Sequence, residues 1–501
     1  MFPKTVEKWD IFEFAAPGRQ EGNPFVDYDI KGVFQSPNET VTADGFYDGD
    51  GVYKVRFMPS FEGDYTFTVS GSFSDEVYTG TFTVTPAAAG NHGPVRVANT
   101  FHFAYEDGTP YYPVGTTCYV WTHQPQELQQ KTLDELRKGY FNKIRFCVFP
   151  KHYDFNFRDP ITFPYEGTPC DNSGLTKYNF NDYLPSNPEN KWDFHRFNPE
   201  HFRLFENRIR DLRDMGVEAD LIIMHPYDRW GFSEMDEECD DLYWKYVIAR
   251  FAAYRNVWWS LANEWEFLKK KTVRDWERYA DILCKKDPYH HLRSIHNAYS
   301  LYDYSRPWIT HCCVQLQEFQ PLEKIPQWRE LYQKPIVVDE LRYEGNIEHD
   351  WGNITGQEMV RRFWEITLRG AYAGHGETFT HPDNLLWWSH GVELHGESPE
   401  RLKFLHKILC ESPYTGLNPS QKEYRTAVSA PTFGPNDYRI LYFGNARPAY
   451  KRFYFDDTNE YEVEIIDTWG MTIEKAGVFK GRFEVTLPGR EFMALHIRRV
   501  G

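Results

Sequence analysis

The chain has 501 residues, of which 41% are hydrophobic, 26% charged and 17% aromatic, an ordinary globular composition apart from the many aromatic rings. Its 56 Lys and Arg residues against 73 Asp and Glu residues give a net charge of −17, so we expect no nucleic-acid partner, and an acidic polysaccharide would need a local basic patch. No apolar run reaches the roughly 18 residues that a membrane-spanning helix needs, so we expect no membrane partner either.

At roughly 100–200 residues per domain, the length predicts two to four domains, and the first part of the chain is rich in strand signals. Apolar and polar residues alternate in segments that contain Thr, Val and aromatic residues, which is typical of half-buried strands. These segments are 51–57, 64–69 and 78–84, with glycine-containing turns at 48–51 and 62–64. We predict an immunoglobulin-like β-sandwich over residues 1–86, followed by a Pro-, Ala- and Gly-rich linker up to residue 94.

From residue 95 to residue 412, short apolar runs alternate with amphipathic helical segments. The expected strands are 112–118, 143–149, 219–225, 257–262, 292–297, 309–314, 335–340 and 373–379. The helices expected between most of them are 128–140, 201–215, 242–254, 272–285 and 358–370. This alternation predicts an α/β fold, a (β/α)8 TIM barrel. A doubly wound sheet is the alternative, but no Gly-rich turn follows the first strand.

Strand signals return over residues 415–501. The expected strands are 438–443, 461–466, 481–487 and 492–497, with turns at 467–470 and 488–489. We predict a second β-sandwich here, so that the barrel is flanked by sandwiches on both sides.

The chain shows no sign of a secretory leader or of a metal-binding cysteine pair. Its first residues lack a basic start followed by an apolar stretch. The 8 Cys residues are spread out without a CxxC pair, so neither a disulfide scaffold nor a zinc site is expected. We expect a cytoplasmic protein without cofactor or metal, or a secreted one if a signal peptide was removed, and the oligomeric state stays open.

Two carboxylates come at the ends of separate predicted barrel strands. Asn263 and Glu264 directly follow the fourth strand, and Glu340 ends the seventh. Active sites of such barrels lie at the carboxyl ends of the strands, so we expect both carboxylates in one pocket. Cleavage of a glycosidic bond needs such a pair, because one carboxyl protonates the leaving oxygen while the other attacks the anomeric carbon or activates water. The sequence therefore predicts a glycoside hydrolase.

A resemblance to a known family is carried by Tyr111–Thr117, Trp259–Trp265 and Pro335–Glu340. These segments are similar to those of clan A retaining glycoside hydrolases, and most closely to the apiosidase-like branch, whose members often carry β-sandwiches at both ends. The resemblance implies double displacement with Glu340 as nucleophile and Glu264 as acid/base, their carboxyl groups about 5–5.5 Å apart. It implies that Asn263 binds the hydroxyl beside the anomeric carbon, and we expect a plant-derived glycoside or oligosaccharide as the carbohydrate substrate.

Further residues near strand ends are candidates for substrate binding. In clan A enzymes an arginine at the position of Arg145 touches the nucleophile and keeps it ionised. Glu377, near the end of the eighth strand, would bind hydroxyls or replace Glu340 as nucleophile, and Glu266 is the rival of Glu264. The remaining candidates are His225, His296, His311, Gln315, Trp121 and Trp388. For these histidines and aromatic residues, packing in the core is the competing interpretation.

The segment between Pro150 and His201 is long for a barrel loop. Such an insert shapes the pocket and favours exo action, with an open cleft for endo attack as the alternative. Two other functions stay open. A non-catalytic carbohydrate-binding protein would keep the barrel without turnover. A metal-dependent barrel hydrolase would use as ligands His225, His296, His311, His375 and Asp339.

Overall fold

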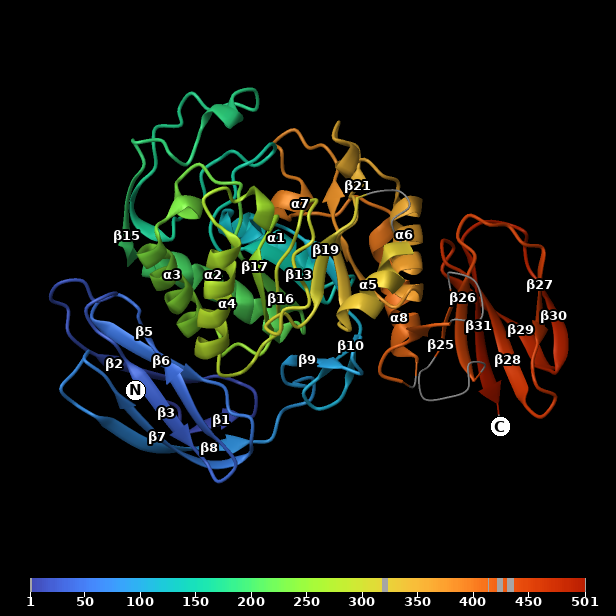
Figure 1. Ribbon diagram of the computed structural model, residues 1–501, viewed down its shortest axis with the longest axis horizontal. Helices are drawn as coiled ribbons and strands as arrows, with labels where there is room; N and C mark the ends of the chain where they lie inside the picture. The colour runs from blue at the N-terminus through green and yellow to red at the C-terminus, as the bar shows by residue number, and fades with distance from the viewer. Residues whose placement is uncertain (1, 318–322, 413, 421–426, 430–436, 501) are drawn as a thin grey trace.

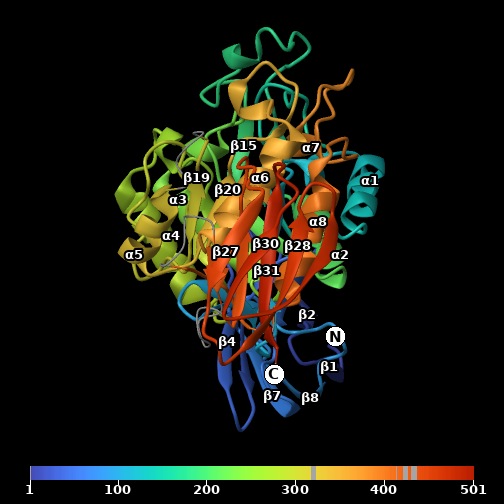
Figure 2. The same ribbon diagram turned by 90° about the vertical axis from the view of Figure 1, so that its right-hand side faces the viewer.

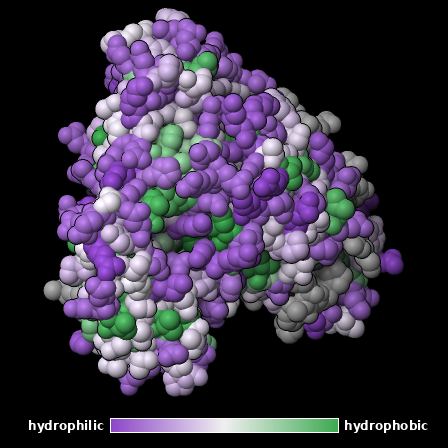
Figure 3. All heavy atoms as spheres, turned by 60° about the vertical axis from the view of Figure 1, so that its left-hand side comes forward, coloured by the Kyte–Doolittle hydropathy of each residue, from purple (hydrophilic) through white to green (hydrophobic). Residues whose placement is uncertain are grey.

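The computed structural model describes residues 2–317, 323–412, 414–420, 427–429 and 437–500 (Figure 1). A barrel of strands and helices occupies the centre, with N-terminal strands below it and C-terminal strands beside it in this view. On the face turned forward in Figure 3, hydrophilic residues predominate and apolar residues form small separate groups. Within the described residues, no helix has both the length and the apolar character that crossing a membrane requires.

The N-terminal part consists of two sheets packed on aromatic side chains. One sheet has the order β1-β8-β7-β3-β4 and the other β2-β6-β5. Their bounds are β1 (Thr5–Glu7), β2 (Phe12–Pro17), β3 (Lys31–Gln35), β4 (Thr40–Asp44), β5 (Phe46–Tyr47), β6 (Val52–Phe57), β7 (Gly63–Ser70) and β8 (Tyr78–Thr85). The rings of Phe12 and Phe82 lie 4.1 Å apart, and those of Phe34 and Phe57 lie 4.4 Å apart. The alternating segments of the sequence thus place one face of each sheet in a shared core.

The centre is a parallel eight-stranded sheet in the order β18-β17-β16-β13-β12-β22-β20-β19. A parallel bridge between His296 and Cys313 joins its two outer strands, so the sheet nearly closes into a barrel. The strands are β12 (Val114–Thr117), β13 (Lys143–Cys147), β16 (Glu218–Met224), β17 (Val257–Ala262), β18 (Arg293–Ser294), β19 (Cys312–Gln315), β20 (Ile336–Glu340) and β22 (Tyr372–His375). Each lies within or overlaps a strand expected from the sequence, and the predicted (β/α)8 fold is confirmed.

Helices cover the outside of the barrel, and α2 shows how the sequence forms them. Asn198 caps its start by accepting the Glu200 N–H (3.1 Å), and Pro199 occupies the first turn. Its buried stripe packs Phe205 against the barrel residue Phe146, with ring centroids 5.3 Å apart. The helices are α1 (Gln126–Leu136), α2 (Pro199–Asp214), α3 (Glu237–Phe251), α4 (Val273–Lys286), α5 (Lys324–Tyr332), α6 (Gly356–Leu368), α7 (Trp387–His390) and α8 (Ser398–Cys410).

A small sheet before the first barrel strand closes the amino end of the barrel. Its strands are β9 (Val95–Ala98), β10 (His102–Tyr105) and β11 (Pro110–Tyr111). Phe103 from β10 is 1% exposed and contacts the rings of Trp258 (5.2 Å), Tyr372 (5.4 Å) and His311 (5.9 Å). This apolar plug leaves the carboxyl end as the side from which a ligand enters the barrel.

Inside the barrel, an ion cluster ties strands β13, β16 and β20 together. The Lys143 ammonium donates to Asp220 (2.6 Å) and to Asp339 (2.8 Å), and all three residues are buried. Cys313 Sγ donates to the other oxygen of Asp339 (2.9 Å). Because Asp339 precedes Glu340, this cluster fixes the end of β20 from which Glu340 projects.

Loops at the carboxyl end carry further short elements. The insert between β13 and α2 contains β14 (Tyr165–Thr168) paired with β15 (Lys191–Phe197), and it rises at the top of Figure 1, opposite the N-terminal strands. Two short strands, β21 (Glu344–Gly345) and β23 (Glu377–Thr378), pair with each other in parallel. Single helical turns are η1 (Trp121–His123), η2 (Phe180–Asp182), η3 (Phe232–Glu234), η4 (Trp265–Phe267) and η6 (Asp350–Gly352).

The C-terminal strands form a sheet of order β24-β25-β26-β31-β28-β29 and a β27-β30 pair. They are β24 (Asn418–Pro419), β25 (Ala427–Ser429), β26 (Tyr438–Tyr442), β27 (Tyr450–Tyr454), β28 (Glu460–Asp467), β29 (Thr472–Lys480), β30 (Arg482–Thr486) and β31 (Met493–Val500). Figure 2 shows them in front of α6 and α8. Trp364 of α6 contacts Tyr442 (5.3 Å between rings), and Arg401 of α8 lies over Trp469 (3.7 Å). Aromatic contacts thus attach this part to the barrel.

A buried ion cluster attaches the N-terminal strands to the barrel. Arg56 of β6 contacts both carboxylate oxygens of Glu206 on α2 (2.8 and 3.0 Å). Arg250 on α3 donates to Glu206 (2.6 Å) and to Asp48 (2.8 Å). Burial alone would raise the pKa of Glu206, but Arg250 and Arg56 outweigh it and lower the pKa to about 2. Its stabilising contribution is complete above the unfolded pKa of about 4.3 and is lost as the pH falls toward about 2.

We expect Glu206→Gln to lower the free energy of unfolding by about 3–5 kcal/mol, because two buried guanidinium groups then lose their shared carboxylate. Denaturant unfolding at neutral pH measures this loss. The matched control is Glu200→Gln in the exposed first turn of the same helix, which we expect to cost less than about 1 kcal/mol. Similar losses in the two variants would contradict the role given to Glu206.

Candidate active site

The backbone after β17 sets the direction of Glu264. The Asn263 N–H donates to Met224 O (2.9 Å), and the Trp265 N–H donates to His296 O (3.0 Å). Between these anchors Glu264 adopts a left-handed conformation with φ of +48°, which costs a residue other than glycine roughly 1–2 kcal/mol. The two hydrogen bonds hold this strained residue in place. Glu264 is consequently only 7% exposed although it follows the strand end.

Three polar side chains surround the carboxyl group of Glu264. The Tyr227 hydroxyl and the Asn263 amide (3.2 Å) donate to its Oε2. Gln315, in the amide orientation that satisfies both of its polar atoms, donates to Oε1 (3.1 Å). Burial and then the charge of Glu340 raise the pKa of Glu264 to about 7, against the opposing effects of the Lys151 charge and the Tyr227 hydrogen bond. A carboxyl group with this pKa can hold and donate a proton near neutrality.

The carboxylate of Glu340 is held by positively charged and hydrogen-bonding groups. Tyr119 donates its hydroxyl hydrogen to Oε1, Arg145 Nη1 lies 3.3 Å from the same oxygen, and His296 Nε2 lies 3.5 Å from it. Burial alone would raise the pKa of Glu340. The hydrogen bond and charge of His296, followed by Arg145 and Tyr119, outweigh burial and lower the pKa to about 2. Between about pH 2 and pH 7, Glu340 is therefore ionised while Glu264 keeps its proton.

The two carboxyl groups line one cavity of about 170 Å³ at the carboxyl ends of the barrel strands. A chain of contacts also joins them, because the Tyr119 hydroxyl that donates to Glu340 lies 3.3 Å from Asn263, whose amide contacts Glu264. The cavity is lined by Tyr119, Lys151, Tyr153, Tyr227, Glu264, Phe267, Tyr299, Gln315, Gln317, Glu340, Tyr343, Trp351 and Trp388. One acid and one carboxylate facing a shared aromatic cavity suit acetal chemistry.

A family model of the apiosidase-like catalytic domain matches residues 98–402, which is more than half of the chain. The chain belongs to the apiosidase-like family. Two domains of unknown function match the flanking strands of this apiosidase-like protein, DUF5060 over residues 5–72 and DUF5605 over residues 429–498.

Solved structures agree with this membership. A crystal structure from Bacteroides vulgatus ATCC 8482, assigned as a glycoside hydrolase, is 36% identical, with 99% of this chain and 100% of that chain covered and a TM-score of 0.91. Two other solved structures share the fold at 16% identity, each with 81% of this chain covered. One is described as a glycoside hydrolase, with a TM-score of 0.60 and 97% of that chain covered. The other is a family 5 glycoside hydrolase from Bacteroides vulgatus ATCC 8482, with a TM-score of 0.59 and 94% of that chain covered. No curated protein matches the chain. The apiosidase-like protein is thus a glycosidase built on a clan A barrel.

Five of the predicted substrate-binding residues lie at or beside this cavity. Gln315 and Trp388 line it directly. Asn263 contacts Glu264, and Arg145 and His296 contact Glu340, as described above. Strand ends β13, β17, β18 and β19 therefore contribute side chains to one place, as the barrel rule expects.

Four other predicted substrate-binding residues do not line the cavity, which corrects the expectation that they face it. His225 donates to Phe149 O (3.1 Å) and packs on that ring, and Trp121 packs on Phe146 (5.7 Å between rings). His311 lies at the amino end of β19, against the apolar plug. Burial lowers the pKa of both histidines to about 3, so both are neutral core residues.

Glu377 is the fourth, and it belongs to a buried cluster with Glu344 and His375, whose ligand atoms lie within 4.8 Å of one another. Backbone N–H groups of residues 395–398 donate to the two carboxyls, for example His395 to Glu377 (2.6 Å) and Glu397 to Glu344 (2.7 Å). Backbone N–H donors that point at the carboxyl groups disfavour a cation between them. The hydrogen bonds hold the start of α8 in place, which gives the cluster a structural role. Among the described residues, this is the one group of three or more possible metal ligands that lie close enough to share an ion. The five ligands of the metal-dependent alternative therefore do not gather in one site.

Glu266, the rival of Glu264, has a structural role. Its Oε1 accepts the backbone N–H groups of Ala298 (2.9 Å), Tyr299 (2.7 Å) and Ser300 (2.8 Å). This contact positions the loop that presents Tyr299, which is 85% exposed, at the rim of the cavity.

Sequence reasoning missed several lining residues, above all Tyr119, Lys151 and Tyr227. Each follows the carboxyl end of a barrel strand by two to four residues. The rule that singled out Glu264 could therefore have found them. Tyrosine was not a distinguishing signal because the chain contains 33 of them.

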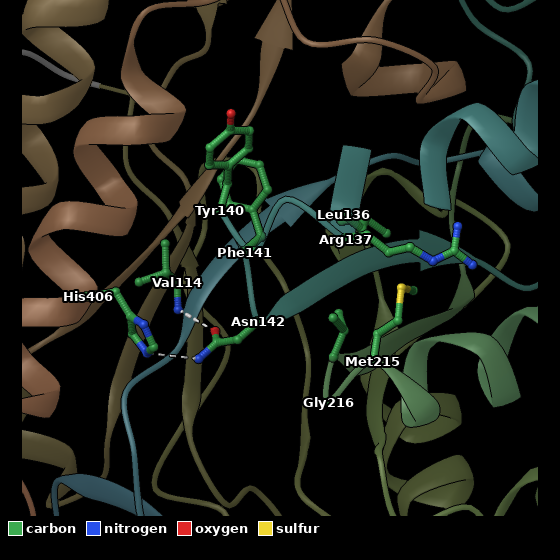
Figure 4. A pocket seen from close by; sticks show the side chains of 11 residues that line it. Val114, Leu136, Arg137, Tyr140, Phe141, Asn142, Met215, Gly216 and His406 are labelled. Carbon is green, nitrogen blue, oxygen red and sulfur yellow. Dashed lines mark hydrogen bonds between the residues drawn. The ribbon is translucent and has the colours of Figure 1, made fainter. Parts of the chain in front are cut away.

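A second cavity, of about 350 Å³, lies at the opposite end of the barrel (Figure 4). Its main polar group is Asn142, which accepts the Val114 N–H (2.8 Å), donates to Tyr112 O (2.9 Å) and lies 3.3 Å from His406 Nε2. The amide is thus satisfied by the fold itself, and the described residues that line this cavity include no carboxylate. This cavity is larger than the one between Glu264 and Glu340 but lacks its chemistry.

Proposed function

We propose that the protein is a retaining glycoside hydrolase that cleaves a terminal sugar from a plant-derived glycoside or oligosaccharide. The observation that carries the proposal is the pair of carboxyl groups with opposite protonation in one cavity. The family resemblance supports the substrate class. Exo action is supported by the cavity volume of about 170 Å³, which is below the roughly 300 Å³ at which sites for drug-sized ligands begin.

In the first step, Glu340 attacks the anomeric carbon while Glu264 gives its proton to the leaving oxygen, which forms a glycosyl ester on Glu340. In the second step, the ionised Glu264 takes a proton from water, the water oxygen attacks the anomeric carbon, and the Glu340 carboxylate leaves. Asn263 is placed to contact the hydroxyl beside the anomeric carbon. Exposed Tyr299 and neighbouring Phe267 (5.9 Å between rings) offer surface for the leaving group beyond Glu264.

The test begins with a panel of aryl glycosides and plant oligosaccharides. Proton NMR of the product formed first reports its anomeric configuration. Retention together with a burst of the aryl leaving group supports double displacement. A product of inverted configuration contradicts the proposal. So does the absence of hydrolysis of every compound in the panel after prolonged incubation.

We expect a bell-shaped pH dependence of kcat/KM. Activity needs an ionised Glu340, whose pKa is about 2, and a protonated Glu264, whose pKa is about 7. The rate should therefore be level in mildly acidic buffer and fall about tenfold per pH unit above roughly pH 7. Initial rates across the pH range, with a folding check at each pH, measure the profile. A rate that rises through neutrality contradicts these assignments.

A further inference from the structure

Lys151 lies in the catalytic cavity but has no part in the double displacement. It follows β13 and is only 4% exposed. Its ammonium nitrogen lies over the rings of Tyr119 (3.5 Å), Tyr227 (4.1 Å) and Trp388 (5.0 Å). Across the described part of the chain, that nitrogen makes no hydrogen bond or ion pair, although an ammonium carries three donors.

Among the described residues no carboxylate of the cavity contacts the Lys151 ammonium directly, although the charges of Glu264 and Glu340 act on it from a distance and oppose the effect of burial on its pKa. Arg145, at 3.3 Å, balances the carboxylate of Glu340, and Glu264 keeps its proton below about pH 7. Burial lowers the pKa of Lys151 to about 8, so the ammonium is still charged at neutrality. Ring faces offset part of the cost of burying this cation, but they accept no conventional hydrogen bond from it.

A buried cation with unpaired donors that faces a sugar cavity calls for an anionic acceptor on the ligand. We propose that Lys151 binds the carboxylate of a uronic-acid unit, so that the cavity prefers an acidic sugar to its neutral counterpart. This rests on the proposed function only in assigning the cavity to a sugar. The net charge of −17 repels long polyanions, whereas this single enclosed cation would accept one terminal acidic unit.

The experiment compares binding of D-galacturonate and D-glucuronate with D-galactose and D-glucose by isothermal titration calorimetry on the full chain at about pH 6, where Glu264 keeps its proton. We expect at least one uronate to bind about 10- to 100-fold more tightly than its neutral counterpart, the range of a charge-assisted hydrogen bond. Lys151→Met should abolish that preference, and Lys151→Arg should retain part of it. The matched control is Lys177→Met, an exposed lysine of the same insert, which should bind like wild type.

Equal binding of acidic and neutral sugars, no binding of either uronate, or a preference that survives in Lys151→Met overturns the proposal. The wild-type comparison needs no variant, so a misfolded Lys151→Met protein does not block the test. If Lys151 only tuned Glu264, the variant would shift the pH profile for all substrates without changing the preference. The two proposals fail separately, because aryl uronides and neutral aryl glycosides report turnover independently of uronate binding.

Discussion

Glu340→Ala is expected to lower kcat/KM by about 10⁴-fold or more, because the variant lacks the oxygen that bonds to the anomeric carbon. Glu340 is held ionised by His296, Arg145 and Tyr119, and among the described residues that line the cavity the one other carboxyl group is that of Glu264. Sodium azide should restore turnover of an activated aryl glycoside, since the anion fits the space of the missing carboxylate. The product should be a glycosyl azide of inverted configuration, which NMR identifies.

Glu377→Ala is the informative comparison, since the sequence left Glu377 open as an alternative nucleophile. The structure places this residue in the cluster beside α8, where it accepts two backbone N–H groups. We expect its removal to lower the melting temperature without creating an azide-rescued defect. Azide rescue of Glu377→Ala, or full activity in Glu340→Ala, contradicts the assignment of the nucleophile.

The barrel and its two carboxylates were predictable because both follow from local sequence. Each apolar run is buried on both faces, as residues 257–262 are throughout β17, and the polar residues that follow such runs come together at one end. Glu264 and Glu340 could be singled out as candidates from their position alone, directly after one apolar run and at the end of another. The family resemblance then supplied their roles.

Side-chain direction just beyond a strand could not be predicted in the same way. His225 and Tyr227 are two residues apart after β16, yet His225 packs outward on Phe149 while Tyr227 reaches Glu264. The turn between them depends on contacts with the segment after β13, where the His152 N–H donates to Tyr227 O (2.8 Å), and the local pattern does not encode these contacts. The apolar plug was missed for a related reason, since β9–β11 are two to four residues long and too short for a periodicity.

Glu264→Gln is expected to lower kcat by about 10²- to 10⁴-fold on glycosides with poor leaving groups, which need a proton on the departing oxygen. The decrease in the rate of the first step should be much smaller on dinitrophenyl glycosides, because their leaving group departs without that proton. The alkaline fall of the pH profile near pH 7 should vanish, because the group that titrates with a pKa of about 7 is gone. Initial rates for a series of aryl leaving groups measure all three effects.

The matched control is Glu266→Gln, which removes a carboxylate two residues away. Its Oε1 positions the loop of Tyr299 through backbone N–H groups, so we expect a raised KM with the alkaline limb and leaving-group dependence unchanged. If the alkaline limb instead follows Glu266, the proton donor is Glu266. The left-handed backbone at Glu264 would then serve only to turn the chain out of β17.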